Sequence, residues 1–519
     1  MVRKFLCLVL LAPVLAFLGG CGDSQGSPAG PASVSSTNNP QVALYTIQPS
    51  SSGKVSVDFG ETTSYGQKTW EVATPSDGSA VKIYVAGMKA NTTYHMRAQV
   101  HYDNGKTAMD NDRTFKTGSL PKEILEGATV ITGARQAPQS GVEVVDATLS
   151  DLPNYLEAYV TDMQGNLIWG YNYPDRDANS IVQPIKLLPN GDFGMIISYA
   201  SQFLFDPTKQ SKINTLREID LAGNTVRELK LDDLNNRLKT AGYTFTALDY
   251  HHDFAYLPNG HWIVLVNLVK PFTDLPGFPG TTQVIGDALI DLDADWNPVW
   301  VWNEFDHLDV NRHPMAFPDW THTNAVVYSA DDGNLLVSMR HQNWIVKVDY
   351  GNGEGSGNIL WHLGQGGDFQ LVNGSDPEDW FYAQHGPTFQ TDATAGKFSL
   401  AVMDNGDDRI LPAGCGDAGE PACLYTTIPV YEIDETAMTA TLKFHQIIPP
   451  DQYSFFGGNT TRLGNGNLEY DLCALPGFTG IVREVTQDSA AKTVWQMTVT
   501  HSNVYRAYRI SSLYPGVQW

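Results

Sequence analysis

Three histidines stand out because each begins a similar stretch of sequence. His252, His322 and His385 each lie at or beside the start of a short apolar run, followed by a glycine turn and a second apolar run. If such repeats close into a ring, residues at the same point of each repeat meet in space. Neutral imidazoles can bind anions, transfer protons or act as nucleophiles. The spacing therefore predicts one site built from three distant segments.

Two further polar residues are expected at the same place. Arg340 falls where we expect the turn between the second and third strands of the fourth repeat, on the rim where the first strands start. Asn324 should point the same way as His322, because side chains two residues apart in a strand share a face. Together with the histidines, these residues would form a donor-rich pocket suited to an oxyanion.

Other interpretations of these residues are open at this point. Three histidines can also bind zinc, but an arginine in the same mouth would repel a cation, so we predict no metal. The turn Asp404–Arg409 would either orient His385 or bind calcium. We expect the following histidines to be structural or surface residues: His251, His261, His341, His362 and His445.

The elements that must position the site are β-strands. From about residue 121 the chain repeats a glycine turn, an apolar strand, a strand ending near aspartate, another turn and a strand that often contains tryptophan, as in Leu257–His261 and Pro298–Trp302. Six such units predict an all-β fold, a six-bladed β-propeller over residues 119–519. The strand near Tyr505–Arg509 should pair with the first blade. A solenoid or two sandwiches are alternatives, but closure removes exposed strand edges.

The segment before the repeats divides into three parts. Arg3, Lys4, a short apolar stretch and Leu18-Gly-Gly-Cys21 predict a lipoprotein signal peptide over residues 1–20, with lipid on Cys21. A membrane helix is the alternative, but the apolar run is too short. Residues 21–40 are rich in Ser, Gly, Pro and Asn, which predicts a flexible tether. Alternating apolar residues predict a small β-sandwich resembling fibronectin type III over residues 41–118.

The remaining cysteines and the net charge narrow the function further. Cys415 and Cys423 share one loop, and in an exported chain a disulfide between them is favoured over a structural zinc pair. Cys473 follows an apolar run and is expected to be a buried thiol.

The net charge excludes one class of partner. The 519 residues carry a net charge of −24, which argues against a nucleic-acid partner.

The chain resembles the bacterial arylsulfate sulfotransferase family at the site residues. His-His-Asp at 251–253, Asp-Trp-Thr-His-Thr-Asn at 319–324, Ser-Met-Arg-His-Gln at 338–342 and Gln384-His385 are similar to that family's active-site segments. The resemblance spans roughly the whole exported chain, including the small N-terminal β domain and the six-bladed propeller. The cysteine pair Cys415 and Cys423 is similar to the family's disulfide. The lipobox departs from the family's best-known members.

The resemblance implies transfer of a sulfuryl group from a phenolic sulfate ester to a phenol, without a nucleotide donor and without a cofactor. His385 matches the residue that becomes sulfated. Arg340 would clamp two sulfate oxygens, Asn324 would hold a third, and His322 and His252 would donate to the sulfuryl group or to the leaving oxygen.

Two other functions are compatible with the same residues. Discharge of the covalent intermediate to water would give an aryl sulfatase, and a non-catalytic propeller would bind anions or partner proteins. The signal peptide places the expected protein in the bacterial cell envelope, as a periplasmic lipoprotein attached to the inner or outer membrane. A homodimer is also compatible with the sequence.

Overall fold

The structure is nearly all β, as the sequence predicts. The computed structural model describes residues 29–120, 128–132, 137–152, 155–171, 180–199, 213–315, 317–407, 409 and 424–519. Within these residues the one α-helix is α2 (Leu231–Thr240). No helix in the described part of the chain has the length and apolarity needed to cross a bilayer. The lipobox with Cys21 and the pair Cys415 and Cys423 lie outside the described residues.

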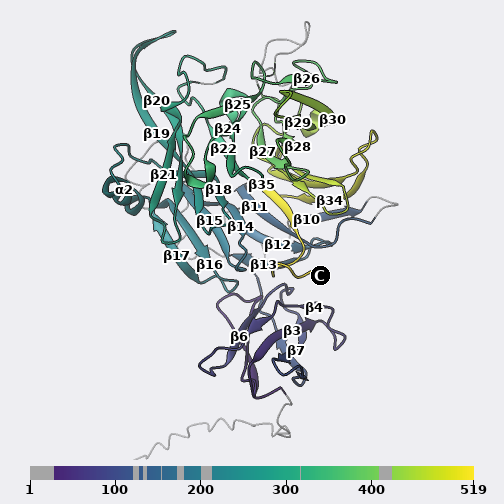
Figure 1. Cartoon of the computed structure of the whole chain (residues 1–519). Coiled ribbons are helices and arrows are strands. Elements are labelled where there is room, and N and C mark those ends of the chain that lie inside the picture. The colour runs from purple at the N-terminus through teal and green to yellow at the C-terminus, as the bar shows by residue number, and fades with distance from the viewer. Residues whose placement is uncertain are drawn as a thin grey trace, which may run out of the picture.

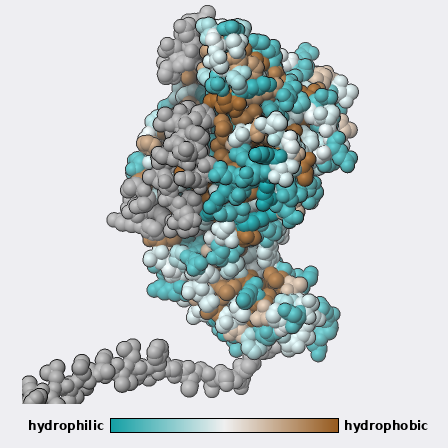
Figure 2. All heavy atoms as spheres, turned by 90° about the vertical axis from the view of Figure 1, so that its left-hand side faces the viewer, coloured by the Kyte–Doolittle hydropathy of each residue, from teal (hydrophilic) through white to brown (hydrophobic). Residues whose placement is uncertain are grey.

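A small N-terminal unit lies below the larger body and consists of two antiparallel sheets (Figures 1 and 2). One sheet contains β1 (Ala32–Ser36), β2 (Ala43–Ile47) and β6 (Val81–Val85). The other contains β3 (Gly53–Gly60), β4 (Gln67–Lys68), β5 (Val72–Ala73), β7 (Thr93–Tyr102), β8 (Thr107–Met109) and β9 (Arg113–Lys116). Alternate residues of β2 and β6 are buried, which explains why the strands of this unit could be recognised.

The expected tether over residues 21–40 is wrong at its C-terminal end. Ala32–Ser36 forms β1, which pairs antiparallel with β2. The side chains of β1 are small and mostly solvent-facing. Their composition is therefore that of a linker, and only the backbone pairing, which composition does not reveal, makes this segment an edge strand.

The described residues of the body form six sheets of four or five strands. The first sheet contains β11 (Val142–Ser150), β12 (Ala158–Asp162), β13 (Leu167–Tyr171) and the C-terminal β35 (Ser502–Ile510). The second contains β14 (Ser180–Leu187), β15 (Phe193–Tyr199), β16 (Thr215–Ile219) and β17 (Thr225–Lys230). The third contains β18 (Tyr250–Tyr256), β19 (Trp262–Leu275), β20 (Phe278–Leu292) and β21 (Pro298–Asn303). The fourth contains β22 (Thr323–Ser329), β23 (Asn334–Met339), β24 (Trp344–Val348) and β25 (Ile359–Gly364). The fifth contains β27 (His385–Phe389), β28 (Lys397–Met403), β29 (Thr427–Asp434) and β30 (Thr439–Ile447), with β26 (Gln370–Val372) at its edge. The sixth contains β31 (Thr460–Arg462), β32 (Leu468–Leu475), β33 (Thr479–Val485) and β34 (Thr493–Val499), with β10 (Ala128–Thr132) at its edge.

One edge strand of each sheet takes part in a closed series of contacts. β14 contacts β18, β18 contacts β22, β22 contacts β27, β27 contacts β31, β31 contacts β35 and β35 contacts β14. β35 also pairs antiparallel with β11, so that Val142 lies opposite Ile510 and Asp146 opposite Arg506. The predicted pairing of the C-terminal strand with the first repeat is therefore confirmed.

A buried arginine lies at this seam between the start and the end of the body. Arg509 of β35 contacts three buried carboxylates: Glu143 of β11 at 2.7 Å, Glu469 of β32 at 2.7 Å and Glu484 of β33 at 3.2 Å. Burial raises the pKa of Glu469 despite the facing guanidinium, and Glu143 adds to the effect. One cation thus stabilises three carboxylates drawn from two neighbouring sheets.

Tryptophans on the fourth strands link neighbouring sheets. Trp169, Trp302 and Trp495 lie on β13, β21 and β34, and each is fully buried. Each indole N–H donates to a backbone carbonyl in the next sheet along the series, and the acceptors are Leu221 at 2.8 Å, Gly357 at 2.7 Å and Met163 at 2.9 Å. The recurring tryptophan in the sequence therefore has a defined role in joining the sheets.

Candidate active site

A cavity of about 690 Å³ lies where β18, β22 and β27 begin. Its lining includes His252, His322, Arg340 and His385. These four residues come from segments that are 18 to 133 positions apart in the chain. The structure thus brings together four of the five residues that the sequence singled out for one site.

Irregular backbone at the strand starts directs the histidines. The pairing of β18 with β19 shifts register between Tyr250 and Phe254, and His252 within the shift has a φ of +55°. A register shift also follows Thr323 in β22, and His322 just before it has a φ of +46°. The left-handed conformation costs a non-glycine residue about 1–2 kcal/mol. Bulges with such strained residues re-aim side chains and are frequent next to functional sites.

His385 is held so that its Nε2 is free of a proton. Its Nδ1 lies 2.7 Å from Oδ1 of Asn405, and the Asn405 amide N–H groups donate to the carbonyls of Ser454 and Gly457. Because Oδ1 can only accept, Nδ1 of His385 must carry the proton. Burial and the nearby positive charge of Arg340 hold the pKa of His385 well below its ordinary value. At neutral pH, Nε2 therefore keeps its lone pair, which faces the Gly457 N–H at 3.3 Å.

Arg340 begins the short 3-10 helix η3 (Arg340–Gln342), where β23 ends. Its Nη2 donates to a carboxylate oxygen of Asp407 and to the Phe455 carbonyl at 3.3 Å. Its Nη1 lies 2.6 Å from Nε2 of His341. The Arg340 side chain is only 13% exposed, and these contacts hold its guanidinium at the cavity wall.

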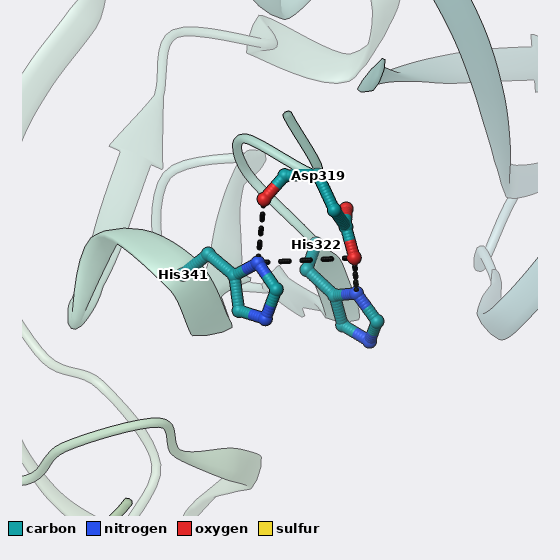
Figure 3. Close-up of side chains that lie close together, drawn as sticks. All are labelled: Asp319, His322 and His341. Carbon is teal, nitrogen blue, oxygen red and sulfur yellow. Dashed lines mark hydrogen bonds and ion pairs between the residues drawn. The ribbon is translucent and has the colours of Figure 1, made fainter. Parts of the chain in front are cut away.

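Asp319 orients two of the site's imidazoles, as Figure 3 shows. Its Oδ2 lies 2.6 Å from Nδ1 of His322, and its backbone carbonyl accepts from Nδ1 of His341 at 2.6 Å. Burial would raise the pKa of Asp319, but the facing His322 outweighs burial and holds this pKa well below its usual range. Burial and the charge of His322 lower the pKa of His341 to about 3, so that ring is neutral.

The same three residues are the one group of metal-ligand types that the described chain brings within 4.8 Å of one another. Their donor atoms are already used, however. Nδ1 of His341 must carry a proton because it faces a carbonyl, and Nε2 of His341 accepts from Arg340. A cation there would also face the guanidinium. The chemistry of the donor set therefore fits hydrogen bonding better than metal coordination.

Asn324 lies elsewhere than expected. It is fully buried and is not among the residues that line the cavity. Its amide N–H donates to the Gln384 carbonyl at 2.7 Å. In a regular strand Asn324 would point in the same direction as His322. The register shift after Thr323 breaks that alternation, so the expectation fails.

Several site residues were not recognised from the sequence. His251 and His341 were expected to be structural or surface residues, yet both line the cavity. Each directly adjoins a predicted site residue in the chain, which was the available signal. The Asp404–Arg409 turn does orient His385, through Asn405. Within it, Asp404 pairs with Arg409.

One wall of the cavity is apolar. Phe455 and Phe456 pack edge to face, with ring centroids 4.8 Å apart, and Phe455 remains 51% exposed. The other apolar lining residues are Leu149, Ile181, Ile285, Phe317 and Pro318. The cavity therefore combines a cationic and imidazole-rich end with a wall suited to an aromatic ring.

Comparison with known proteins identifies the family of this chain. A sequence model described as arylsulfotransferase (ASST) matches residues 131–509. A search of curated proteins gives no match. Solved structures similar to the chain include an ACO/RPE65 chimera, with 12% identity over 93% of this chain and 96% of that one and a TM-score of 0.31. Another is a DUF4221 family member from Bacteroides vulgatus, with 8% identity over 75% and 98% of the two chains and a TM-score of 0.31. These TM-scores are too low to support a shared fold.

Proposed function

Because the chain belongs to the arylsulfotransferase family, we propose that it moves a sulfuryl group from a phenolic sulfate ester to a phenol through a sulfated His385. The observation that carries this proposal is the unprotonated Nε2 of His385, which lines the same cavity as Arg340. A neutral imidazole is a competent nucleophile, and Nε2 of His385 would exchange its contact with the Gly457 N–H for the sulfuryl group. A nucleotide donor is not required by this chemistry.

The proposed architecture that positions the site is a six-bladed β-propeller. The six sheets of the body and the closed series of contacts among their edge strands support it. The N-terminal unit, with its two antiparallel sheets, would be a separate domain resembling fibronectin type III, joined to residues 119–519. In this arrangement the cavity lies at one end of the central axis.

In the first half-reaction, the lone pair of His385 Nε2 forms an N–S bond as the bond between sulfur and the aryl oxygen breaks. The electron pair leaves with the phenolate oxygen, which takes a proton from a cavity imidazole. Arg340 would fork onto two sulfuryl oxygens in place of its present acceptors. A phenol is a fair leaving group because its pKa is about 10, as in tyrosine.

In the second half-reaction, an acceptor phenol gives its proton to the same imidazole as its oxygen attacks sulfur. The N–S bond breaks, and the electron pair returns to His385 Nε2. Atoms and charges then balance over the two steps. The apolar wall with Phe455 and Phe456 would hold the aromatic ring in both of them.

The function is tested by measuring phenol release from an aryl sulfate with and without an added phenol acceptor. We expect turnover to rise with acceptor concentration and to follow ping-pong kinetics, because the two substrates use one site in succession. Turnover that is independent of acceptor, with inorganic sulfate as product, would identify a sulfatase instead. If no phenol is released under either condition, the protein is a binding module.

The replacement Arg340→Ala is expected to slow both half-reactions by about a hundredfold or more, because a fixed donor to the developing charge is lost. Arg340→Lys should fall between this variant and the wild type, since lysine keeps the charge but not the fork. Single-turnover measurements of phenol release and of acceptor sulfation resolve the two steps. As a control, Arg462→Ala changes an exposed arginine. A defect confined to the acceptor step would contradict the clamp role.

The proposed location follows from the N-terminal sequence. The lipobox supports a lipid on Cys21 and attachment to a bacterial envelope membrane, with the enzyme in the periplasm. In that oxidising compartment a bond between Cys415 and Cys423 would form. Cys473, by contrast, is buried and unpaired in the structure.

A further inference from the structure

A second layer of polar residues lies behind His252. Nδ1 of His251 lies 2.8 Å from Nδ1 of His252, and Nε2 of His251 lies 3.2 Å from Oδ1 of Asp287. The side chains of His251 and Asp287 are 2% and 1% exposed. The three residues therefore form a line that runs from the interior of the protein to the cavity.

Asp287 is held as a carboxylate at the inner end of this line. Its Oδ2 accepts from the Thr323 backbone N–H at 2.7 Å and from the Thr321 hydroxyl at 2.8 Å. Burial would raise the pKa of Asp287, but the close contact with His251 and the donors Thr321 and Thr323 outweigh burial and lower this pKa. Burial and the charge of Asp287 raise the pKa of neighbouring Glu304 to about 8. Asp287 therefore presents a carboxylate charge to His251, and the nearby Asp249 also raises the pKa of His251.

Only one proton can lie between the two Nδ1 atoms. The carboxylate next to Nε2 favours a proton there and a positive charge on the ring, which leaves Nδ1 of His251 as the donor. The Asp287 contact raises the pKa of His251 against the effect of burial. Nδ1 of His252 must then accept, so the single proton of a neutral His252 lies on Nε2.

This arrangement at His252 is the reverse of that at His322 and His385, the other two histidines that the sequence predicted for the site. His322 and His385 donate from Nδ1, to Asp319 and Asn405, which leaves Nε2 without a proton in the neutral ring. Protonation of His252 itself is opposed by burial first and then by the neighbouring positive charges, which include His251 and Arg506. Of these three predicted histidines, His252 is thus the one whose neutral form carries its proton on Nε2.

We propose that His251 and Asp287 are positioning residues that fix His252 as a neutral Nε2–H donor to a sulfuryl oxygen. The role of His252 as a donor to a sulfuryl oxygen rests on the proposed function. The tautomer of His252, by contrast, is a property of the protein without substrate. A donor fixed in advance stabilises charge that develops on oxygen without reorganising during the reaction. His322 is then left to exchange the proton with the phenol oxygen.

The first test is the tautomer itself, measured by ¹⁵N NMR on histidine-labelled protein, with His252→Gln used to assign the signals. We expect Nε2 of His252 to be protonated and Nδ1 to be unprotonated in the wild type. Nε2 without a proton would overturn the proposal. This measurement needs neither substrate nor a folded variant of His251, so it stands even if the protein releases no phenol from an aryl sulfate.

The second test compares His251→Leu with His251→Asn in single-turnover release of 4-nitrophenol from 4-nitrophenyl sulfate. The amide N–H of asparagine can replace Nδ1–H of histidine, whereas leucine cannot. We expect His251→Leu to lower the rate constant about tenfold to a hundredfold with little change in KM. His251→Asn should stay within about threefold of the wild type and keep the Nε2–H signal of His252.

A matched control is His261→Leu, which removes another histidine next to an aspartate, Asp291, away from the cavity. It should leave the half-reaction unchanged. If His251→Asn is as slow as His251→Leu while both stay folded, or if His251→Leu retains the wild-type signal of His252 and the wild-type rate, the relay does not act as proposed.

Discussion

Replacement of His385 by asparagine is expected to lower sulfuryl transfer by at least about a thousandfold, because no other group takes over a lost nucleophile. The amide of asparagine offers no lone pair of comparable nucleophilicity near the position of Nε2. The fold should persist, since asparagine is smaller and can still donate to Asn405. Turnover of an aryl sulfate with a phenol acceptor measures the loss, and circular dichroism checks the fold.

The covalent intermediate provides an independent readout of the same variant. Donor alone should sulfate the wild-type protein at a peptide that contains residue 385, and mass spectrometry should find no such peptide in His385→Asn. The matched control is His362→Asn, which changes a partly exposed histidine paired with Asp368. Near-normal turnover by folded His385→Asn, or sulfation at a different residue, would show that the nucleophile is misassigned.

The second large effect concerns stability. Arg509→Met is expected to lower the free energy of unfolding by about 3–5 kcal/mol, because it leaves three buried carboxylates without their cation. Burial already raises the pKa values of Glu143 and Glu469, and these values rise further once the guanidinium is gone, so the folded variant binds more protons than the unfolded chain. Its stability should therefore fall as pH rises above the ordinary carboxyl range, and the deficit should be smaller near pH 4 than at pH 7.

Urea unfolding at several pH values measures this deficit. Arg462→Met is the matched control, because Arg462 forms an ion pair with an Asp392 that is 93% exposed. Exposed pairs contribute about 0–1 kcal/mol, so this variant should unfold close to the wild type. If Arg509→Met also loses less than about 1 kcal/mol at pH 7, the seam does not depend on this arginine.

The strand pattern and the convergence of the site could be predicted because both depend on sequence periodicity. Apolar alternation identifies strands, and the repeated turns identify their grouping into similar units. His252, His322 and His385 occupy comparable points in three units, so their meeting follows from the grouping alone. Arg340 could be placed for the same reason, since turns between the second and third strands lie on the same rim.

The local directions of side chains could not be predicted in this way. His252 and His322 adopt positive φ values that no propensity of histidine indicates. The bulges beside them interrupt the regular alternation of side chains between the two faces of the strand. For this reason Asn324 does not face the cavity as expected, whereas His251 does. The partners of these histidines, Asp319 and Asn405, lie in turns, where aspartate and asparagine are common residue types. Their presence there therefore does not mark them as part of a site. Only the structure shows which imidazole nitrogen each of them meets.

The position of β35 has a consequence for biosynthesis. This strand follows every other strand of the body in the chain, yet it pairs with β11 near the beginning. It carries Tyr505, which lines the cavity, as well as Arg509. A nascent chain released before residue 502 would have unpaired strand edges and buried acids without a counter-ion. Translation must therefore include β35 before the body can fold, and products that stop before Ser502 should be targets for chaperones and proteases rather than weakly active forms.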